Sequence, residues 1–418
     1  MSNKVYNYSS QFVKKLSQFS NNVEKNYTSF KNFPVRFYDG DFVETALSLC
    51  KDLLPTAKVV VFSTANSFSH FGEELNVRLK GQLNQTVNFI IDDNQELNLS
   101  IVKKIINFSE DVRGIIVTDI KLVRLAEYVC SIKNISLILR VDKFLNDGII
   151  KNRIHVKNGE TFDYVKVDLK RHVIIDMEEL SKDENRSSCY VQIMSRVVSL
   201  LDYRIKTCFK DFVPDAFAYG QVKETILDIF GVINYSYYKQ VEVLICGLLK
   251  IEVVNLLING EIDDFSAISG FNYLYGNSEA TIDAIEILLG LYELGYSEKY
   301  DKILSVVDYN KINEELKSKS YSGETELLKW LLNRCQLFSK NKKELSAVSN
   351  FLIPEIQGLK NSFEKIKKTY HVLGGKNYSD KNKKSSNFNF AIKHCGNLPL
   401  SFNGMSLLSE KGVTEFIK

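Results

Sequence analysis

The sequence has few histidines and no long apolar run, and each lack excludes a class of protein. Five of the 418 residues are histidine, and none lies between His172 and His371. The five form no recognisable nucleophile–base arrangement. No apolar run reaches the length that spans a membrane, and the N-terminus lacks the apolar core of a signal peptide. We therefore expect a cytoplasmic protein with no membrane partner.

Paired cysteines and excess charge are also lacking. The seven cysteines are scattered and include no Cys-x-x-Cys pair to hold zinc or to run redox chemistry, so we expect buried free thiols. Lys plus Arg number 54 and Asp plus Glu 51, a net charge of +3. Such a balance gives no nucleic-acid footprint. The partners expected are a small molecule or another protein.

Up to about residue 190, short apolar runs alternate with amphipathic stretches. We predict strands at 58–63, 87–91, 114–118, 135–141 and 171–176, and helices near 71–80, at 99–108 and at 122–129. Continuously apolar strands separated by helices are typical of a parallel sheet covered on both faces. The sequence therefore predicts an α/β, Rossmann-like N-terminal domain.

The remaining segments complete the predicted organisation. Asn158-Gly159, between two alternating runs in 153–167, is typical of a two-residue hairpin turn. From about residue 191 the apolar spacing of three and four predicts an all-α C-terminal domain. The Lys-, Asn- and Ser-rich stretch 374–389 is expected to be a mobile loop, followed by a tail that docks back as a strand or short helix. The predicted domains are a surface extension with one short helix (1–30), the α/β domain (31–185), the helical domain (186–370), and a linker with the C-terminal tail (371–418).

Several stretches carry a family resemblance through their shared order over roughly residues 34–295. They are KVVVFSTANSFSHFGEEL (58–75), RGIIVTDIKLVRLAEYVCSIKNISLILRV (113–141), KFLNDGIIKNRIHVKNGE (143–160), HVIIDMEEL (172–180), QIMSRVVSLLDYR (192–204), AISGFNY (267–273) and DAIEILLGLYEL (283–294). The order resembles the superfamily of 3-dehydroquinate synthase, glycerol dehydrogenase and iron-containing alcohol dehydrogenases, and most closely its glycerol-1-phosphate and glycerol dehydrogenase branch. The resemblance implies a dehydroquinate synthase-like fold with a cleft between its two halves, and it allows a homodimer.

The turn that binds the cofactor pyrophosphate in this superfamily is altered. The resemblance places Thr118, Asp119 and Ile120 where relatives have Gly-Gly-Gly, whose backbone amides approach the phosphates at a helix N-terminus. Side chains then take the space of the phosphate, and Asp119 repels it. Arg124 stands where relatives have an acidic residue. It is either a substitute phosphate clamp or a solvated or ion-paired arginine.

The metal site is altered as well. In active relatives one aspartate and two histidines hold zinc or iron, and the resemblance places Gln192, Tyr273 and Asp283 at these positions. A neighbouring register replaces the last two by Ala280 and Ala284. Neither register supplies the imidazole that these metals favour. Asp283 is either a structural carboxylate or one ligand of a weak magnesium or calcium site. No metal is expected.

One loop retains the pattern of the superfamily. Asn146, Asp147 and Gly148 stand where relatives keep an Asp-Gly beside the substrate, and Lys143 precedes them. The same residues are good turn formers, and the two roles are compatible. We take all four as candidate residues of the substrate cleft.

Three functions remain open from the sequence. The first is a non-catalytic binding, regulatory or scaffold subunit with degenerate nicotinamide and metal sites, for which no cofactor is expected. The second is an active enzyme on a polyol phosphate or sugar phosphate with a reworked cleft. The third keeps NAD(P)-dependent dehydrogenase activity with unusual metal ligands. We favour the first.

Overall fold

The structure of this chain is a computed structural model. It describes residues 11–26, 35–82, 85–94, 98–108, 111–143, 153–158, 161–167, 169–207, 216–259, 267–275, 278–296, 309–317, 342–376, 385–396 and 405. The chain divides into two compact units. The first comprises Met1–Leu145 and Lys151–Lys182, and the second comprises Asn146–Ile150 and Asp183–Lys418.

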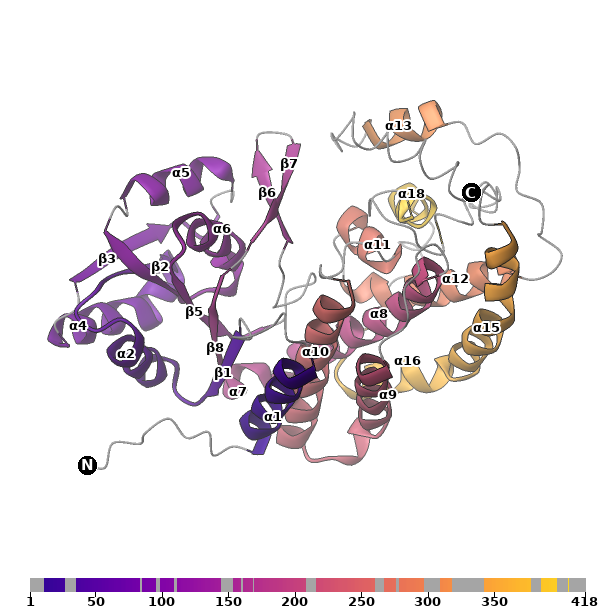
Figure 1. Cartoon of the computed structure of the whole chain (residues 1–418), viewed down its shortest axis with the longest axis horizontal. Coiled ribbons are helices and arrows are strands. Elements are labelled where there is room, and N and C mark those ends of the chain that lie inside the picture. Colours follow the sequence, from indigo (N-terminus) through magenta and orange to yellow (C-terminus); the bar gives the residue numbers. More distant parts are fainter. Residues whose placement is uncertain are drawn as a thin grey trace. The chain divides into compact units, whose positions relative to one another are not determined.

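A six-stranded parallel sheet forms the centre of the first unit (Figure 1). Its strands lie in the order β1 (Val35–Asp39), β8 (Arg171–Ile175), β5 (Ser136–Val141), β4 (Val112–Val117), β2 (Lys58–Thr64) and β3 (Gln85–Ile91). Every neighbouring pair in this sheet is parallel. The expected strands are therefore confirmed, and β1 is added to them at one edge.

Helices cover both faces of the sheet (Figure 1). One face carries α2 (Phe42–Leu53) and α4 (Glu73–Gly81), which contact each other, and the other carries α5 (Leu99–Phe108) and α6 (Val123–Lys133). The helix predicted near 71–80 begins earlier, because α3 (Ala65–Ser67) and the π-helix η2 (Phe68–Gly72) lead directly into α4. The 3-10 helix η3 (Ile120–Leu122) precedes α6, and α7 (Met177–Leu180) follows β8.

The core of this unit is apolar from strand to helix. Val59 and Val61 of β2, Ile116 of β4 and Ile138 of β5 are fully buried, and they pack against Leu47 of α2 in one cluster. Strands buried on both faces need apolar residues at every position, which explains their continuous apolar runs. The core thus fixes the sheet whose carboxyl edge carries the site described below.

The N-terminal segment differs from the expectation of a surface extension with a short helix. Residues Gln11–Asn26 form the four-turn helix α1, which contacts β1. Val13, Leu16, Phe19 and Val23 are buried, with exposed fractions of at most 4%. Their spacing of three, three and four residues places them on one face of a helix. The intervening Lys, Ser and Asn residues obscure this pattern in the sequence.

The predicted hairpin is present. Strand β6 (Arg153–Asn158) pairs antiparallel with β7 (Thr161–Lys166), and Asn158 lies opposite Thr161. Asn158 is therefore the last residue of β6, whereas the prediction made it the first residue of the turn.

The second unit is helical throughout its described residues, as the apolar spacing predicts. Its helices are α8 (Asp183–Thr207), α9 (Ala216–Phe230), η4 (Val232–Asn234), α10 (Tyr237–Asn259), α11 (Ala267–Tyr275), α12 (Ser278–Tyr296), α13 (Tyr309–Lys317), α15 (Lys342–Asn361), α16 (Phe363–Val372) and α18 (Ser386–His394). Among them, α8 contacts α10, α11 and α12. In the part of the chain that is described, no helix has the length and apolarity to cross a bilayer.

The stretch 374–389, expected to be a mobile loop, includes the first residues of a helix. Helix α18 begins at Ser386, and the hydroxyl of Ser385 accepts from the backbone N–H of Phe388 as its N-cap. Phe388 is buried and contacts Phe271 of α11 edge to face, with ring centroids 5.4 Å apart. The tail therefore docks back as a helix, one of the two predicted outcomes. Residues 377–384 lie outside the described residues.

Candidate functional site

The sheet changes direction between β2 and β4. From β2 the chain crosses to β3 on one side, and from β3 it returns to β4 on the other side of β2. In open α/β sheets the loops after two such strands diverge, and ligands bind beyond the carboxyl ends of the strands at this point. In this chain the residues at that position follow Phe62 in β2 and Val117 in β4.

Hydroxyl groups fill this position. Thr118 is fully buried; its hydroxyl donates to the hydroxyl of Ser63 over 2.9 Å and lies 2.8 Å from that of Ser67. The backbone N–H of Thr118 donates to the carbonyl of Phe62 over 3.1 Å, which continues the pairing of the two strands. Thr64 caps α3 and completes a capping box with Ser67. The two strand ends are thus joined side chain to side chain.

Asp119 closes the same network with a negative charge. One oxygen, Oδ2, accepts from the hydroxyl of Thr64 over 2.9 Å, and the other, Oδ1, accepts from the backbone N–H of Lys121 over 2.9 Å. The second bond makes Asp119 the N-cap of η3, which continues into α6. Free N–H groups and the helix dipole attract an anion to such an N-terminus. The chain supplies that anion itself.

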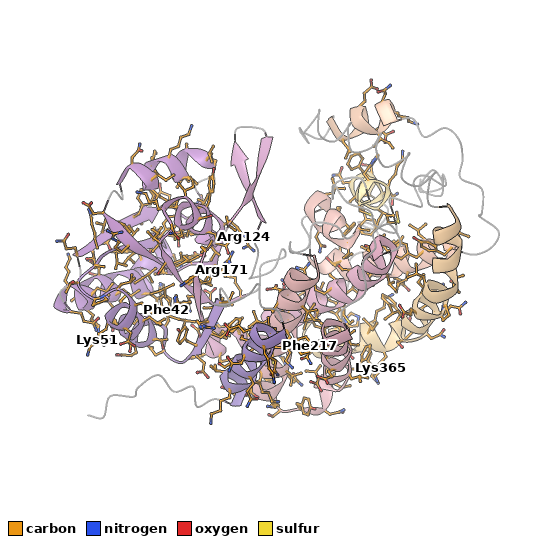
Figure 2. All side chains as sticks on the ribbon, viewed as in Figure 1. Phe42, Lys51, Arg124, Arg171, Phe217 and Lys365 are labelled. Carbon is orange, nitrogen blue, oxygen red and sulfur yellow. The ribbon has the colours of Figure 1, made fainter. Side chains whose placement is uncertain are left out.

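Arg124 is bound inside its own domain. Its Nη1 lies 2.7 Å from Oε2 of Glu127, and Nε of Arg171 lies 2.8 Å from Oε1 of the same carboxylate. Glu127 is fully buried and Arg171 is 3% exposed, while the Arg124 side chain is 14% exposed. Figure 2 labels both arginines in the first unit. Two guanidinium groups therefore share one buried carboxylate. Of the two predicted roles of Arg124, this contact is that of the ion-paired arginine.

A second charged cluster lies at the ends of β5 and β8. Arg140, 5% exposed, donates from Nε and Nη2 to Oδ2 of Asp176 over 3.0 and 2.6 Å, and from Nη1 to Oδ2 of Asp142 over 2.8 Å. Its guanidinium also lies 4.1 Å from the ring centre of Phe71. Burial raises the pKa of Asp142 above its ordinary value, and the charge of Asp119 adds to the rise, although Arg140 opposes it.

Three neighbouring strands of the sheet thus end in an aspartate: Asp119 after β4, Asp142 after β5 and Asp176 after β8. Arg140 is paired with two of them. The sequence interpretation missed Arg140, Asp142, Asp176, Ser63, Thr64 and Ser67. The available signal was an aspartate or hydroxyl residue directly after each apolar run. Within the described residues, no group of three or more His, Cys, Asp or Glu side chains is placed to hold a metal ion.

The proposed substrate loop is only partly described. Lys143 is exposed and follows Asp142 at the carboxyl end of β5. Asn146, Asp147 and Gly148 lie outside the described residues.

In the second unit, Asp202 joins three helices. This fully buried residue of α8 accepts from the backbone N–H of Ala267, the first residue of α11, over 2.8 Å, and from the hydroxyl of Tyr292 in α12 over 2.6 Å. Burial and the neighbouring charge of Asp202 raise the pKa of Tyr292 well above its ordinary value. The carboxylate is therefore a structural anion at a helix N-terminus.

Ten residues earlier on α8, Gln192 is in the opposite situation. It is 4% exposed, and neither its amide oxygen nor its amide nitrogen has a hydrogen-bond partner among the described residues. A buried amide without partners costs about 1–3 kcal/mol. Tyr273 lies on α11 and Asp283, which is buried, lies on α12, and these two helices contact each other and α8. Ala280 and Ala284 of the alternative register are also buried.

No protein-family model matches the chain, and no curated protein matches it either. Solved structures do match. The iron-containing alcohol dehydrogenase from Thermococcus thioreducens is 9% identical, with a TM-score of 0.53 over 92% of this chain and 98% of that chain. The maleylacetate reductase from Rhizobium sp. strain MTP-10005 is 10% identical, with a TM-score of 0.53 over 91% and 96%. The glycerol dehydrogenase from Schizosaccharomyces pombe is 12% identical, with a TM-score of 0.50 over 92% and 90%.

The fold is that of the iron-containing alcohol dehydrogenases. This agrees with the resemblance drawn from the order of sequence motifs. At 9–12% identity the likeness establishes the dehydrogenase fold and carries no activity with it.

The residues at the switch point of this dehydrogenase fold do not fit a nicotinamide dinucleotide bound in the usual way. A pyrophosphate needs free N–H groups at the helix N-terminus, but the Asp119 carboxylate accepts from one of them, the N–H of Lys121. A second anion there would face Asp119 at close range, with Asp142 nearby. Thr118 and Ile120 are fully buried, so their backbone amides are not accessible to a phosphate.

The three residues that the resemblance places at the metal positions do not suit zinc or iron. Gln192 presents a neutral amide and Asp283 a carboxylate, and no histidine lies between His172 and His371. Zinc and iron in such sites favour imidazole and thiolate beside carboxylate. The side chain of Tyr273 lies outside the described residues.

Proposed function

We propose that the chain is a cytoplasmic, non-catalytic protein of dehydrogenase fold that acts as a binding or regulatory subunit. One observation carries this proposal: the carboxylate of Asp119 occupies the helix N-terminus at the switch point and is held there by Thr64 and Lys121. A group that both caps a helix and joins two strands cannot leave without loss of stability. The anion position is therefore closed to a cofactor.

Titration with reduced and oxidised nicotinamide cofactors tests the proposal. We expect no saturable binding of NADH or NADPH at millimolar concentration, measured by nicotinamide fluorescence and by calorimetry. Replacing Thr118, Asp119 and Ile120 together by glycine removes the carboxylate and bares the backbone, and should create measurable dinucleotide binding. Saturable binding to the unaltered protein in the micromolar range would overturn the proposal.

A matched variant separates charge from space. Asp119→Asn keeps the cap through its amide oxygen and removes the negative charge, and its amide nitrogen faces the hydroxyl of Thr64, whose oxygen can accept. If repulsion dominates, this variant should bind the dinucleotide more tightly than the unaltered protein. If occupation of the position dominates, only the triple glycine variant should bind. Circular dichroism of both variants checks that the fold is retained.

Metal content gives a second, independent test. Protein purified without chelator should contain far less than one equivalent of zinc or iron by elemental analysis, because an amide at position 192 replaces a carboxylate. Gln192→Asp supplies that carboxylate and serves as the comparison. Stoichiometric zinc or iron in the unaltered protein would count decisively against a non-catalytic role.

The alternative, an NAD(P)-dependent polyol-phosphate dehydrogenase or a sugar-phosphate enzyme with a reworked site, has one observation in its favour. Gln192 is buried, and neither end of its amide has a partner in the described part of the chain; a polar ligand would satisfy both ends. Glycerol phosphates and sugar phosphates should raise the melting temperature if this alternative holds, and Gln192→Leu should abolish the rise. If Gln192 has no ligand, the leucine variant is instead as stable as the unaltered protein or more stable, since it removes an unsatisfied buried amide.

A further inference from the structure

The positive charge of the chain is concentrated in one segment. Residues 340–384 contain eleven lysines and four acidic residues, a net charge of +7, whereas the whole chain carries +3. The remaining residues therefore carry a net charge of −4. The basic segment includes helices α15 and α16. Such an asymmetry favours a partner of negative charge, and α16 is where the described lysines reach the surface.

Helix α16 turns a basic face towards solvent. Its apolar residues Phe363, Ile366 and Tyr370 are buried, with exposed fractions of at most 4%. On the opposite side of the helix, the exposed residues are Glu364, Lys365, Lys368, His371 and Val372. We call these five residues the basic face. Because the helix has ten residues, the face is about 15 Å long.

A groove with a volume of about 510 Å³ follows the basic face. Its described lining consists of Glu364, Lys367, Lys368, His371 and Val372. Lys367 is already paired, because its Nζ lies 2.6 Å from Oε2 of Glu286 in α12. Lys368 has no ion-pair partner among the described residues. His371 donates from Nδ1 to the carbonyl of Gly375 over 3.0 Å, which leaves its Nε2 for another group.

The stability of α16 explains only part of this arrangement. Cations near the C-terminal end of a helix interact favourably with its dipole, which accounts for Lys368 and His371. Lys365 stands in the first turn, where the dipole disfavours a cation (Figure 2). Its Nζ lies 5.5 Å from the ring centre of Phe230, and no described carboxylate pairs with it. The charge of Lys365 is therefore available to a partner.

The geometry of the basic face favours one kind of anionic partner over the others. A helix binds an anionic membrane by inserting its apolar side, but the apolar side of α16 is buried in the second unit. A nucleic-acid backbone would meet the carboxylates of Glu364 and Glu286 at the same groove. A free phosphate is too small for a groove of this volume. An extended acidic peptide matches both the length and the charge of the face.

We propose that the basic face of α16 binds an acidic peptide segment of another protein. Carboxylates of the segment pair with Lys365 and Lys368, and an apolar side chain of the segment packs on Val372, which is 52% exposed. Complementary charges of this kind speed association and select the partner. This inference uses no residue of the switch point and stands whether or not the proposed function holds.

A synthetic acidic peptide tests the proposal on the full chain. The probe is a fluorescein-labelled peptide of about twelve residues in which glutamate alternates with serine around one leucine, and its control has glutamine in place of glutamate. By fluorescence anisotropy we expect a dissociation constant below about 100 µM, at least about tenfold weaker binding of the control, and weaker binding at higher salt. No saturation at about 1 mM, or equal binding of the two peptides, overturns the proposal.

Paired lysine variants test which surface binds the probe. Lys365→Gln with Lys368→Gln should weaken binding at least about tenfold. Lys103→Gln with Lys104→Gln, at exposed lysines of α5, is the matched control, because it changes the net charge equally and should leave the affinity unchanged. Circular dichroism checks that both proteins are folded. Equal losses in the two double variants would assign binding to net charge alone and contradict the proposal.

A gain of affinity provides a check that damage to the fold cannot imitate. Glu364→Gln removes the carboxylate that lines the groove, and it should strengthen binding of the acidic probe about twofold or more. Unchanged or weaker binding of this variant would place the probe elsewhere. Vesicles of phosphatidylserine and inorganic phosphate are the remaining probes. If either binds the unaltered chain and loses binding in the Lys365 and Lys368 double variant, the face serves lipid or phosphate and the proposal fails.

Discussion

The hydroxyl of Thr64 donates to the carboxylate of Asp119 over 2.9 Å, so the last residue of β2 is bonded to the N-cap of the helix that follows β4. In a doubly wound sheet these two ends border the crevice that receives a nucleotide phosphate. Here the crevice is bridged by two side chains of the chain itself. At the helix N-terminus of this dehydrogenase fold, where free N–H groups favour an anion, the negative charge present is the carboxylate of Asp119.

Loss of that carboxylate should destabilise the first unit. Asp119→Ala removes both the cap of η3 and the acceptor for Thr64, and should lower the free energy of unfolding by about 1–2 kcal/mol. Asp119→Asn keeps one acceptor, which can still cap η3, and turns the other into a donor towards the oxygen of the Thr64 hydroxyl, so it should lose less than Asp119→Ala. Urea denaturation followed by circular dichroism gives both values. Equal losses for the two variants would show that charge, not capping, holds this turn.

Glu127 should be among the most sensitive positions. Glu127→Gln leaves Arg124 and Arg171 next to a neutral amide in the core, and removing one partner of a buried ion pair costs about 3–5 kcal/mol. Glu178→Gln, at an exposed glutamate in α7, is the matched control and should change stability by less than about 0.5 kcal/mol. Chemical denaturation measures both. A loss of less than about 1 kcal/mol in Glu127→Gln would mean that water reaches this carboxylate.

Asp202 should hold the helices of the second unit together. Asp202→Asn turns one of its two acceptors into a donor, which then faces either the N–H of Ala267 or the hydroxyl of Tyr292. We expect a loss of about 2–3 kcal/mol. Tyr292→Phe removes only one hydrogen bond and should cost about 1 kcal/mol. The double variant should cost less than the sum of the two, and strict additivity would exclude a direct coupling.

His172 should make stability fall in mild acid. This residue of β8 is 8% exposed and lies 3.1 Å from the hydroxyl of Tyr38 through Nδ1. Burial, with smaller effects from Arg36 and Lys170, lowers its pKa to about 4. The unfolded chain therefore takes up a proton below pH 6.5 that the folded chain refuses. Stability is complete above that pH and declines as the pH falls towards 4, by about 3 kcal/mol.

The variant His172→Gln removes this titration and should flatten the stability profile between pH 4 and 6.5. His70→Gln, at an exposed histidine, serves as the control and should leave the slope unchanged. Denaturant midpoints at a series of pH values give both profiles. An unchanged slope in His172→Gln would assign the acid sensitivity to other groups.

Much of the fold could be predicted because its signal is local and repeated. The runs at 58–63 and 135–141 are continuously apolar, which suits strands buried on both faces, and the helix at 99–108 was placed at its observed ends. The short helix expected within residues 1–30 is longer and buried on one face, which the sequence did not show because four apolar residues among polar neighbours indicate burial only when a long helix is already assumed.

The candidate site divides differently. The sequence by itself determined which groups are present at each position: a carboxylate at 119, where the resemblance leads us to expect glycine, an amide at 192, where it leads us to expect aspartate, and no histidine between His172 and His371. Which residue stands at a given position is a local property, so it is known from the sequence without the structure.

Only the tertiary structure decided how those groups are used. Asp119 meets Thr64, and Glu127 lies between Arg124 and Arg171, through contacts that the sequence does not display. The buried amide of Gln192 has no partner among the described residues, which is likewise a fact of packing. Their energies depend on distance and on exclusion of water, which arise when the sheet orders its strands and the helices close over it. The identity of a residue fixes which hydrogen bonds and charges it can offer. Packing decides whether other residues of the same chain already use them.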